Sequence, residues 1–449
     1  MAGGTWVAQD KKRPGAYINT KGVATEQPES SRGTVLLMDG VKHDWGKHGI
    51  IPLNAASKFK ALLGSDLLDS QNKALRAVIN SGASKVLYVN NNDGQKAIVK
   101  DDNLPFTFIA KYAGSKGNNI MVDVIKSLSG DTVTVKVIYD HVITSTQRIT
   151  RADELMGDDY VDVSLTDNYA DKFSKLSGEK TYQLAGGTSN YGNDTELLSE
   201  AISTNIFEVA TTAGYPIDSN IHPLLSQMVE DLRNQEGYKV TAVVPGLVST
   251  NYNAESTSVV INGYVLSDGT IVDTTSAAGY FAGASATVPY NQSLTYAEIS
   301  GAVDTLPRMD NETITSAISN GKVVFSNRID GSVVIEEDIN SLTGFNNDKP
   351  QAFAKNRVIR TLDYIANDTK NVFEKSFIGK VTNNGTGQDL FKSNRVTALQ
   401  NMQTEGMIED FQPDDVQITA GDAKDSMVIN LNIKPVDSME KIYMTIAAN

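Results

Sequence analysis

The chain ends in the stretch Ser438-Met-Glu-Lys-Ile-Tyr-Met-Thr-Ile-Ala-Ala-Asn449, whose apolar positions predict a final strand. The run before it, Asp425-Ser-Met-Val-Ile-Asn-Leu-Asn-Ile-Lys434, alternates apolar and polar residues, which is typical of a half-buried strand. A break at Pro435 separates the two runs. A strand that ends a chain often completes a sheet. That sheet belongs either to the same subunit or to a neighbour, and the sequence leaves both interpretations open.

Composition bounds the class of protein. A length of 449 residues predicts two to four domains. A hydrophobic content of 40% and a charged content of 21% are typical of a soluble globular protein. The absence of a long apolar run, and a start without a secretion signal, indicate synthesis in the cytoplasm and no direct membrane contact. A net charge of −14 argues against direct nucleic-acid binding.

Basic residues gather in two regions of this acidic chain. Residues 1–24 hold four basic residues against one acidic residue, a local charge of +3. Residues 349–380 hold seven against three, a local charge of +4. Such patches either face solvent or pair with acidic surfaces of other copies or of a partner.

Apolar periodicity predicts an α/β core that is interrupted by a β unit. Strands are expected at 33–38 and 84–89 around a helix at 67–79. Short alternating strands between about 95 and 188 indicate an inserted small β-sandwich. The core then resumes with a helix at 195–204 and a β-α-β unit made of strand 206–210, helix 219–236 and strand 238–244.

The rest of the chain predicts two hairpins and an α+β unit. One hairpin is expected from 259–266, turning at 267–269, and another from 322–325 to 333–335. Small residues at 277–286 predict a closely packed helix, and longer helices are expected at 352–377 and 390–405. The fold class is therefore α/β and α+β multidomain. The predicted units are an N-terminal arm at 1–24, the α/β core at 25–94 and 191–343, the sandwich at 95–190, a C-terminal α+β domain at 344–437 and a C-terminal strand or arm at 438–449.

Catalytic and metal-binding patterns are scarce. The sequence holds no phosphate-binding P-loop and no Gly-x-Ser-x-Gly nucleophile turn. It contains no cysteine, which excludes disulfides and thiolate metal sites. The four histidines, His43, His48, His141 and His222, form no ligand motif. We therefore expect no catalytic residue, no cofactor and no metal. The competing enzyme interpretation is a hydrolase that uses the loop at 185–192.

Several stretches resemble contractile phage-tail sheath proteins. The C-terminal matches are Phe353-Ala-Lys-Asn-Arg-Val-Ile-Arg-Thr-Leu-Asp-Tyr-Ile365, Phe377-Ile-Gly-Lys-Val-Thr-Asn383, Val416-Gln-Ile-Thr419 and Ile433-Lys-Pro-Val-Asp-Ser-Met-Glu-Lys-Ile-Tyr-Met-Thr-Ile446. Earlier matches are Arg13-Pro-Gly-Ala-Tyr-Ile-Asn19 and Ala110-Lys-Tyr-Ala-Gly-Ser-Lys-Gly-Asn118. Similar proteins occur in R-type bacteriocins and related contractile injection systems.

The resemblance implies a structural protein rather than an enzyme. It implies a homopolymer of stacked hexameric rings around a tail tube, which contracts from a metastable extended state and drives the tube through the target cell envelope. The implied partners are the tail tube, baseplate and tail-terminator proteins. The implied location is the virion tail or a bacteriocin particle, assembled in the bacterial host cytoplasm. The alternative is another phage tail or baseplate structural protein.

The resemblance also implies two sets of contact residues. Arms at both termini of family members exchange strands between subunits, and the matching positions are Ala16, Tyr17, Ile18, Asn19, Lys441, Ile442, Tyr443 and Met444. We further predict that the basic start of the 352–377 helix contacts the tail tube through Lys355, Arg357 and Arg360.

Overall fold

The computed structural model describes residues 3–4, 16–17, 32–127 and 131–447. The chain separates into two units, Met1–Arg32 and Gly33–Asn449. In the first unit, β1 (Gly3–Gly4) pairs in parallel with β2 (Ala16–Tyr17). The predicted arm residues Ile18 and Asn19 lie outside the described residues. All further elements belong to the second unit.

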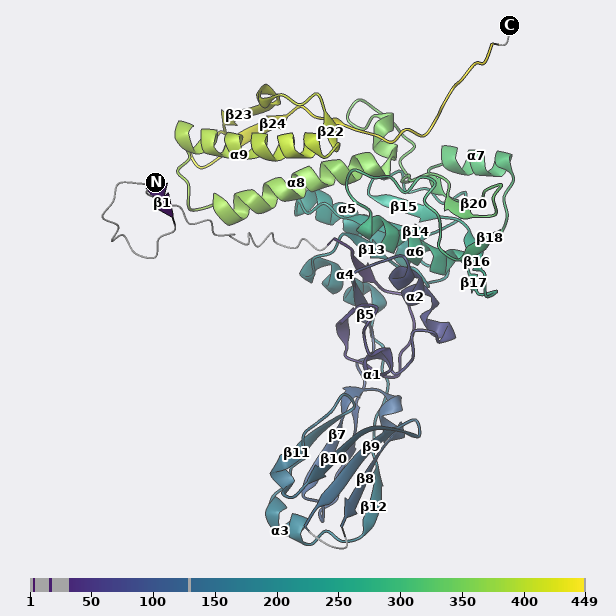
Figure 1. Ribbon diagram of the computed structural model, residues 1–449, viewed down its shortest axis with the longest axis vertical. Coiled ribbons are helices and arrows are strands. Elements are labelled where there is room, and N and C mark those ends of the chain that lie inside the picture. Colours follow the sequence, from purple (N-terminus) through teal and green to yellow (C-terminus); the bar gives the residue numbers. More distant parts are fainter. Residues whose placement is uncertain (1–2, 5–15, 18–31, 128–130, 448–449) are drawn as a thin grey trace. The chain divides into compact units, whose positions relative to one another are not determined.

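A seven-stranded sheet forms the centre of the second unit (Figure 1). Its neighbouring strands run parallel except for the antiparallel pair at one edge. In sheet order the strands are β19 (Lys322–Val323), β15 (Thr257–Val260), β14 (Thr241–Pro245), β13 (Val209–Thr211), β3 (Thr34–Leu37), β5 (Lys85–Asn90) and β4 (Gly49–Leu53).

Alternation along the strands gives this sheet two apolar faces. Val35 and Leu37 pack with α2 (Lys73–Asn80) and α6 (Thr274–Thr287), whereas Leu36 and Met38 pack with α4 (Asp194–Thr204) and α5 (Ile221–Gln235). Successive side chains of a strand point to opposite faces, so helices cover both sides of the sheet. The predicted β-α-β unit is confirmed by β13, α5 and β14.

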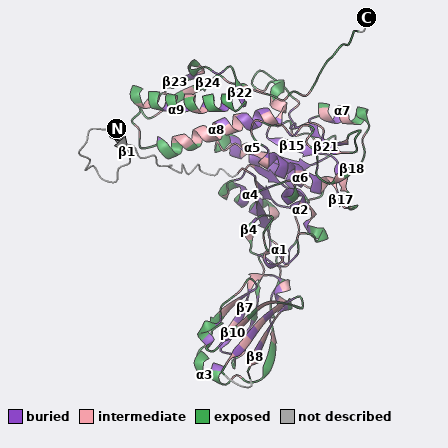
Figure 2. Cartoon of the chain, viewed as in Figure 1, coloured by how far each residue is buried: buried purple, intermediate pink, exposed green. Residues whose placement is uncertain are grey.

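Small residues let α6 approach α2 closely. A Cβ atom on Gly283 would lie 1.9 Å from Ser81 Oγ and 2.7 Å from Val78 O. A Cβ atom on Gly279 would lie 2.9 Å from Ala74 O. The predicted close packing of this helix is confirmed, and ten of its 14 residues are buried (Figure 2).

Two antiparallel sheets enclose one apolar core in the inserted sandwich. The first sheet holds, in order, β10 (Val142–Ile149), β9 (Val133–Tyr139), β8 (Ile120–Lys126) and β12 (Glu179–Gln183). The second holds β11 (Val161–Leu165), β7 (Phe106–Ala113) and β6 (Lys96–Val99). The short helices α1 (Phe59–Leu63) and α3 (Tyr169–Ser174) flank this region. Trp45, from the loop before β4, is buried in the same core and donates to Ala61 O.

Two long helices and two small sheets form the C-terminal region. These elements are α8 (Asn356–Ser376), α9 (Gly385–Thr404), the antiparallel pair β22 (Ile408–Glu409) with β25 (Lys434–Pro435), and the antiparallel pair β23 (Val416–Ala420) with β24 (Met427–Leu431). Ile365, Leu399 and Met402 are among the residues of their shared core. Met427, Ile429 and Leu431 are half-buried on one face of β24, as the alternation predicts.

Both hairpin predictions need correction. The run 259–266 is not one strand, because β15 ends at Val260 in the main sheet and β16 (Gly263–Leu266) begins a separate sheet with β17 (Ile271–Val272) and β18 (Ala302–Leu306). The run 322–325 likewise divides into β19 and β20 (Phe325–Asn327), and only β20 pairs with β21 (Val333–Ile335). In the sequence, α7 (Asn311–Ser319) lies between β18 and β19. Each error joined a parallel strand of the main sheet to the first strand of a separate antiparallel sheet.

The mixed α/β and α+β fold class is confirmed by these sheets and helices. Among the described residues, the model contains no helix of the length and apolarity that a membrane span requires.

Candidate assembly surface

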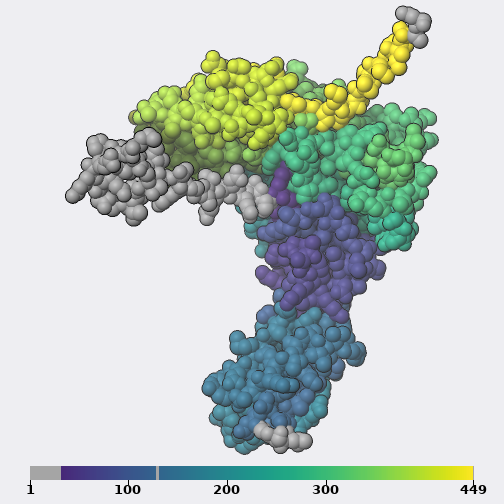
Figure 3. Space-filling model, in the orientation of Figure 1, coloured from purple at the N-terminus to yellow at the C-terminus, as the bar shows by residue number. Residues whose placement is uncertain are grey.

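The C-terminal segment, Val436–Ala447, forms no helix or strand within its own chain (Figure 1). Its large apolar side chains are exposed, with Met439 at 96%, Ile442 at 83% and Tyr443 at 92% of their full accessible area. Figure 3 shows this yellow segment uncovered by other atoms on the face in view. The sequence left open whether the final strand completes a sheet of its own subunit. The described strands of this chain do not pair with it.

Exposure of this kind is unfavourable in water. Ile442, Met444 and Ile446 fall on one side of an extended chain, and each buried apolar Å² stabilises by about 25 cal/mol. Once the segment is buried at an interface, its backbone groups also need protein partners in place of water. Both needs are met when the segment pairs with another sheet edge.

The first part of the segment is nevertheless held by its own subunit. Val436 N donates to Met407 O at 3.0 Å, directly after the β22–β25 pair. Arg357 Nη1 donates to Ser438 Oγ at 2.9 Å. Glu440 forms an ion pair with Lys355, with an Nζ to Oε2 distance of 2.5 Å.

The three basic residues predicted to contact a tail tube all have partners inside the chain. Lys355 binds the carboxylates of Glu337 and Glu440, and Arg357 binds Ser438. Arg360 is buried, and its Nη2 lies 2.7 Å from Asp338 Oδ2. Sequence reasoning missed these acids because periodicity within one segment does not show which distant residue pairs with it. The tube contact itself stays a prediction.

Charge is well compensated around Lys355. Burial alone would lower the pKa of this ammonium group, but its bonds to Glu337 and Glu440 outweigh burial and raise the pKa above the ordinary 10.5. The stabilisation from a raised lysine pKa is present below pH 10.5 and is lost only as the pH rises through the higher folded-state value. The lysine is therefore charged throughout the physiological range.

A second buried ion pair attaches α8 to the central sheet region. Arg233 of α5 binds Asp363 of α8 through both guanidinium Nη atoms, at 2.6 and 2.8 Å. Asn367 of α8 exchanges hydrogen bonds with the backbone of Lys239. Directional bonds of this kind fix the angle of α8.

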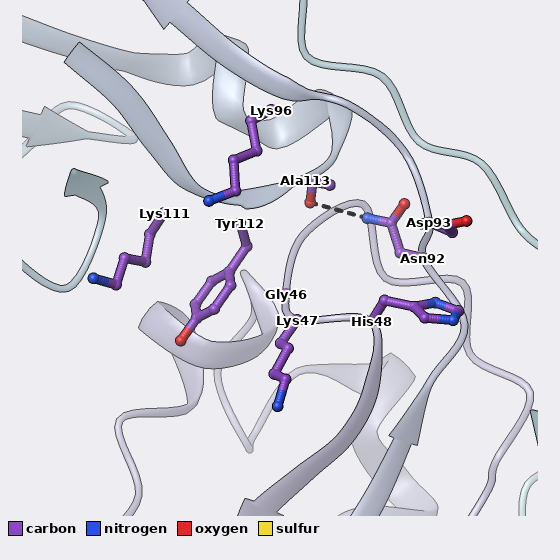
Figure 4. A pocket seen from close by; sticks show the side chains of 9 residues that line it. All are labelled: Gly46, Lys47, His48, Asn92, Asp93, Lys96, Lys111, Tyr112 and Ala113. Carbon is purple, nitrogen blue, oxygen red and sulfur yellow. Dashed lines mark hydrogen bonds between the residues drawn. The ribbon is translucent and has the colours of Figure 1, made fainter. Parts of the chain in front are cut away.

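An open pocket of about 300 Å³ lies between β4 and the start of the sandwich (Figure 4). Its lining includes Lys96 and Lys111, which both pair with Asp162. Asn92, also at its edge, donates to Ala113 O at 3.0 Å. A single carboxylate therefore serves both lysines, and Lys47 and Asp93 also line the pocket.

Other candidate sites are structural. Within the described ranges, His, Cys, Asp and Glu residues form no group suited to a metal ion. His43 hydrogen-bonds Tyr88, and His222 hydrogen-bonds Thr212. In the 185–192 loop, Gly187 N donates to Asn118 Oδ1 and Tyr191 OH donates to Asp44. The loop thereby ties the sandwich to the core.

Two family models match the chain. The model described as the phage tail sheath protein central domain matches residues 200–341, and the phage tail sheath C-terminal domain matches residues 348–449. Protein XkdK of the phage-like element PBSX from Bacillus subtilis is 30% identical, and the alignment covers 100% of both chains.

Solved structures agree with these matches. The sheath tail protein Lin1278 from Listeria innocua is 28% identical with a TM-score of 0.78, over 92% of this chain and 94% of that one. The helical sheath of the anti-feeding prophage in its contracted state has the same fold, with a TM-score of 0.55 at 11% identity over 98% and 100% of the two chains.

These findings define a structural subunit of a tail assembly rather than an enzyme. The chain belongs to the phage tail sheath protein family. Its family therefore places it in the sheath of a phage tail.

Proposed function

We propose that the chain polymerises as stacked hexameric rings in a helix around a tail tube, and contracts from a metastable extended state to drive the tube through a target cell envelope. The observation that carries this proposal is the C-terminal segment, in which five large apolar side chains between Met439 and Ile446 are at least 72% exposed. Baseplate and tail-terminator proteins are the further proposed partners. Assembly takes place in the bacterial host cytoplasm.

Strand exchange joins the subunits in this proposal. Residues 16–19 and 441–444 leave their own subunit and add to a sheet of another copy. The β23–β24 sheet is a suitable acceptor, since the described strands extend it on neither side. Backbone hydrogen bonds between a donated strand and its acceptor sheet survive rigid-body rotation, while side-chain patches between the bodies exchange.

A helical polymer needs a contact that does not close on itself. A donor segment and an acceptor sheet are different surfaces of one subunit, so their pairing is heterologous and generates a filament or ring. The energy for contraction then lies in the difference between two packings of the same subunits, and nucleotide binding is not required.

Negative-stain electron microscopy tests this function. The full chain is compared with a variant that lacks residues 1–21. Hollow striated tubes from the full chain and dispersed particles from the variant are expected. Tubes from both would contradict the role of the N-terminal arm. If neither forms a polymer with a tail tube supplied, the proposed function is wrong.

The tube contact of Lys355, Arg357 and Arg360 has its own test. Charge reversal at all three positions is expected to impair sheath formation on a tube. Because these residues also hold Ser438, Glu440 and Asp338, loss of assembly must be accompanied by loss of tube binding by dispersed subunits. Normal tube-dependent assembly by the variant would contradict the contact.

A further inference from the structure

The C-terminal segment contacts its own subunit up to one residue and is exposed after it. Ser438 and Glu440 face the subunit, whereas Met439 and Lys441 are exposed. This alternation is that of an extended chain lying along a surface. From Lys441 to Ala447 every residue is exposed. Glu440 is therefore the last attachment point of the described segment.

Both oxygens of the Glu440 carboxylate are used. Oε2 lies 2.5 Å from Lys355 Nζ, and Oε1 accepts a hydrogen bond from Thr295 Oγ1 at 2.8 Å. The side chains of Glu440 and Lys355 are only 12% and 19% exposed. An ion pair with this little exposure is weakly screened, and removing one partner costs more than at an open surface.

The groups around Glu440 come from distant parts of the chain. Thr295 lies between α6 and β18, Glu337 follows β21, and Lys355 immediately precedes α8. Thr295 and Glu337 lie in the region matched by the central-domain model, and Lys355 lies in the region matched by the C-terminal model. The contact therefore joins the terminal segment to both domains at their boundary.

Apolar packing does not hold this part of the segment. Met439 is 96% exposed, and the large apolar side chains after Glu440 are exposed as well. Before Glu440, the hydrogen bonds of Ser438 and Val436 are the nearest other attachments. The direction in which the segment leaves the subunit thus depends on polar contacts at two alternate residues.

We propose that Glu440 is the positioning residue of the C-terminal arm: held by Lys355 and Thr295, it fixes the point at which the arm leaves the subunit. The role of Glu440 within its own subunit does not depend on the proposed function. The joining of the arm to another copy does rest on it. The free arm is then residues 441–449, which reach about 30 Å when extended. Release of Glu440 moves the exit point back to Ser438 or Val436, and adds two to four residues, or about 7–13 Å, to the reach.

The test measures the arm in dispersed subunits. The chain contains no cysteine, so spin labels attach only at introduced sites. Ser393→Cys, exposed on α9, and Tyr443→Cys, in the exposed segment, supply the pair. Dilution with unlabelled chain suppresses signals between subunits, and pulsed dipolar spectroscopy gives the distance distribution.

Glu440→Gln is expected to widen that distribution and extend its upper limit by about 7–13 Å. The thermal unfolding midpoint should change little, because Lys355 keeps its ion pair with Glu337 and the released residues are exposed. Glu440→Asp, which keeps the charge, should restore part of the narrow distribution. Lys441→Gln is the matched control, because it removes an adjacent exposed charge, and it should match the parent. A Glu440→Gln distribution as narrow as the parent's would overturn the inference.

Electron microscopy of the same variants separates this inference from the proposed function. If the parent chain forms tubes and Glu440→Gln forms fewer or irregular ones, both stand. If the parent forms no tubes, the proposed function fails while the distance result still decides the role of Glu440. Regular tubes from Glu440→Gln together with an unchanged distance distribution would overturn the inference alone.

Discussion

Helix α6 and the segment 436–447 are both rich in apolar residues, yet one is buried and the other exposed. Ala277, Phe281 and Ala282 of α6 lie inside the subunit, whereas Ile442 and Met444 contact little of it (Figure 2). A helix satisfies its own backbone hydrogen bonds, so side-chain packing suffices to place it. A strand needs the backbone of a partner. We therefore propose that the segment without a partner in its own subunit forms the contact between subunits.

Among the changes that test this comparison, deletion of residues 441–449 is expected to have the largest effect. Tube formation should be lost completely, because the donated strand is gone. The thermal unfolding midpoint should stay within about 2 °C, since exposed residues contribute little to the fold. Electron microscopy and calorimetry measure the two results. A truncated chain that still forms tubes, or that unfolds early, would show that the segment belongs to its own subunit.

Arg233→Met tests a third kind of contact, buried but ionic. The substitution leaves the carboxylate of Asp363 buried without its cation, and we expect a loss of about 3–5 kcal/mol in the free energy of unfolding. Lys175→Met is the matched control, because its pair with Asp171 is exposed and should cost less than about 1 kcal/mol. Denaturant titration measures both. Equal losses of unfolding free energy in the two variants would mean that the attachment of α8 to α5 depends on packing rather than on charge.

Gly283→Val tests the close packing of α6. Its Cβ would collide with Ser81 and with Val78 O, and overpacking of this kind should destabilise the fold by about 3 kcal/mol. Ser203→Val, on the exposed side of α4, controls for the helix propensity of valine and should cost less than about 1 kcal/mol. If the two variants unfold at the same urea concentration, α6 is less tightly packed than the distances indicate.

Asp39→Asn gives the smallest and most specific effect. Burial raises the pKa of Asp39 to about 6 despite hydrogen bonds from Tyr88 and Val41. A raised carboxyl pKa favours folding below the unfolded value of 3.8, and that contribution is lost as the pH rises to about 6. Relative to the asparagine variant, the parent should lose about 2 kcal/mol of unfolding free energy between pH 4 and 6. Parallel stability curves for both proteins would contradict this pKa.

Sequence patterns predicted the elements whose signal lies within one segment. The alternation at 425–434 gave β24, and the stripe beginning at Ile221 gave α5. The antiparallel pairs β16–β17 and β20–β21 lie at the predicted turns. The predicted first strands began too early, because a continuous apolar run does not show where the chain leaves the main sheet after β15 and β19.

The attachment of the final segment was not predicted. Lys355 and Glu440 stand 85 positions apart, and a basic cluster at a helix start looks the same whether it faces solvent or binds an acid of its own chain. The final segment was predicted as a strand, but residues 436–447 form no strand within their own chain. That it lacks a partner there could be recognised only once the rest of the chain was folded.

The most direct test is an electron cryomicroscopy map of the assembled polymer at a resolution that shows side chains. The account predicts that residues 441–447 of one copy form a strand on a sheet of another copy, with Glu440 still bound to Lys355 of its own subunit. Density that shows this segment folded back onto its own subunit, or unpaired at the polymer surface, would contradict it.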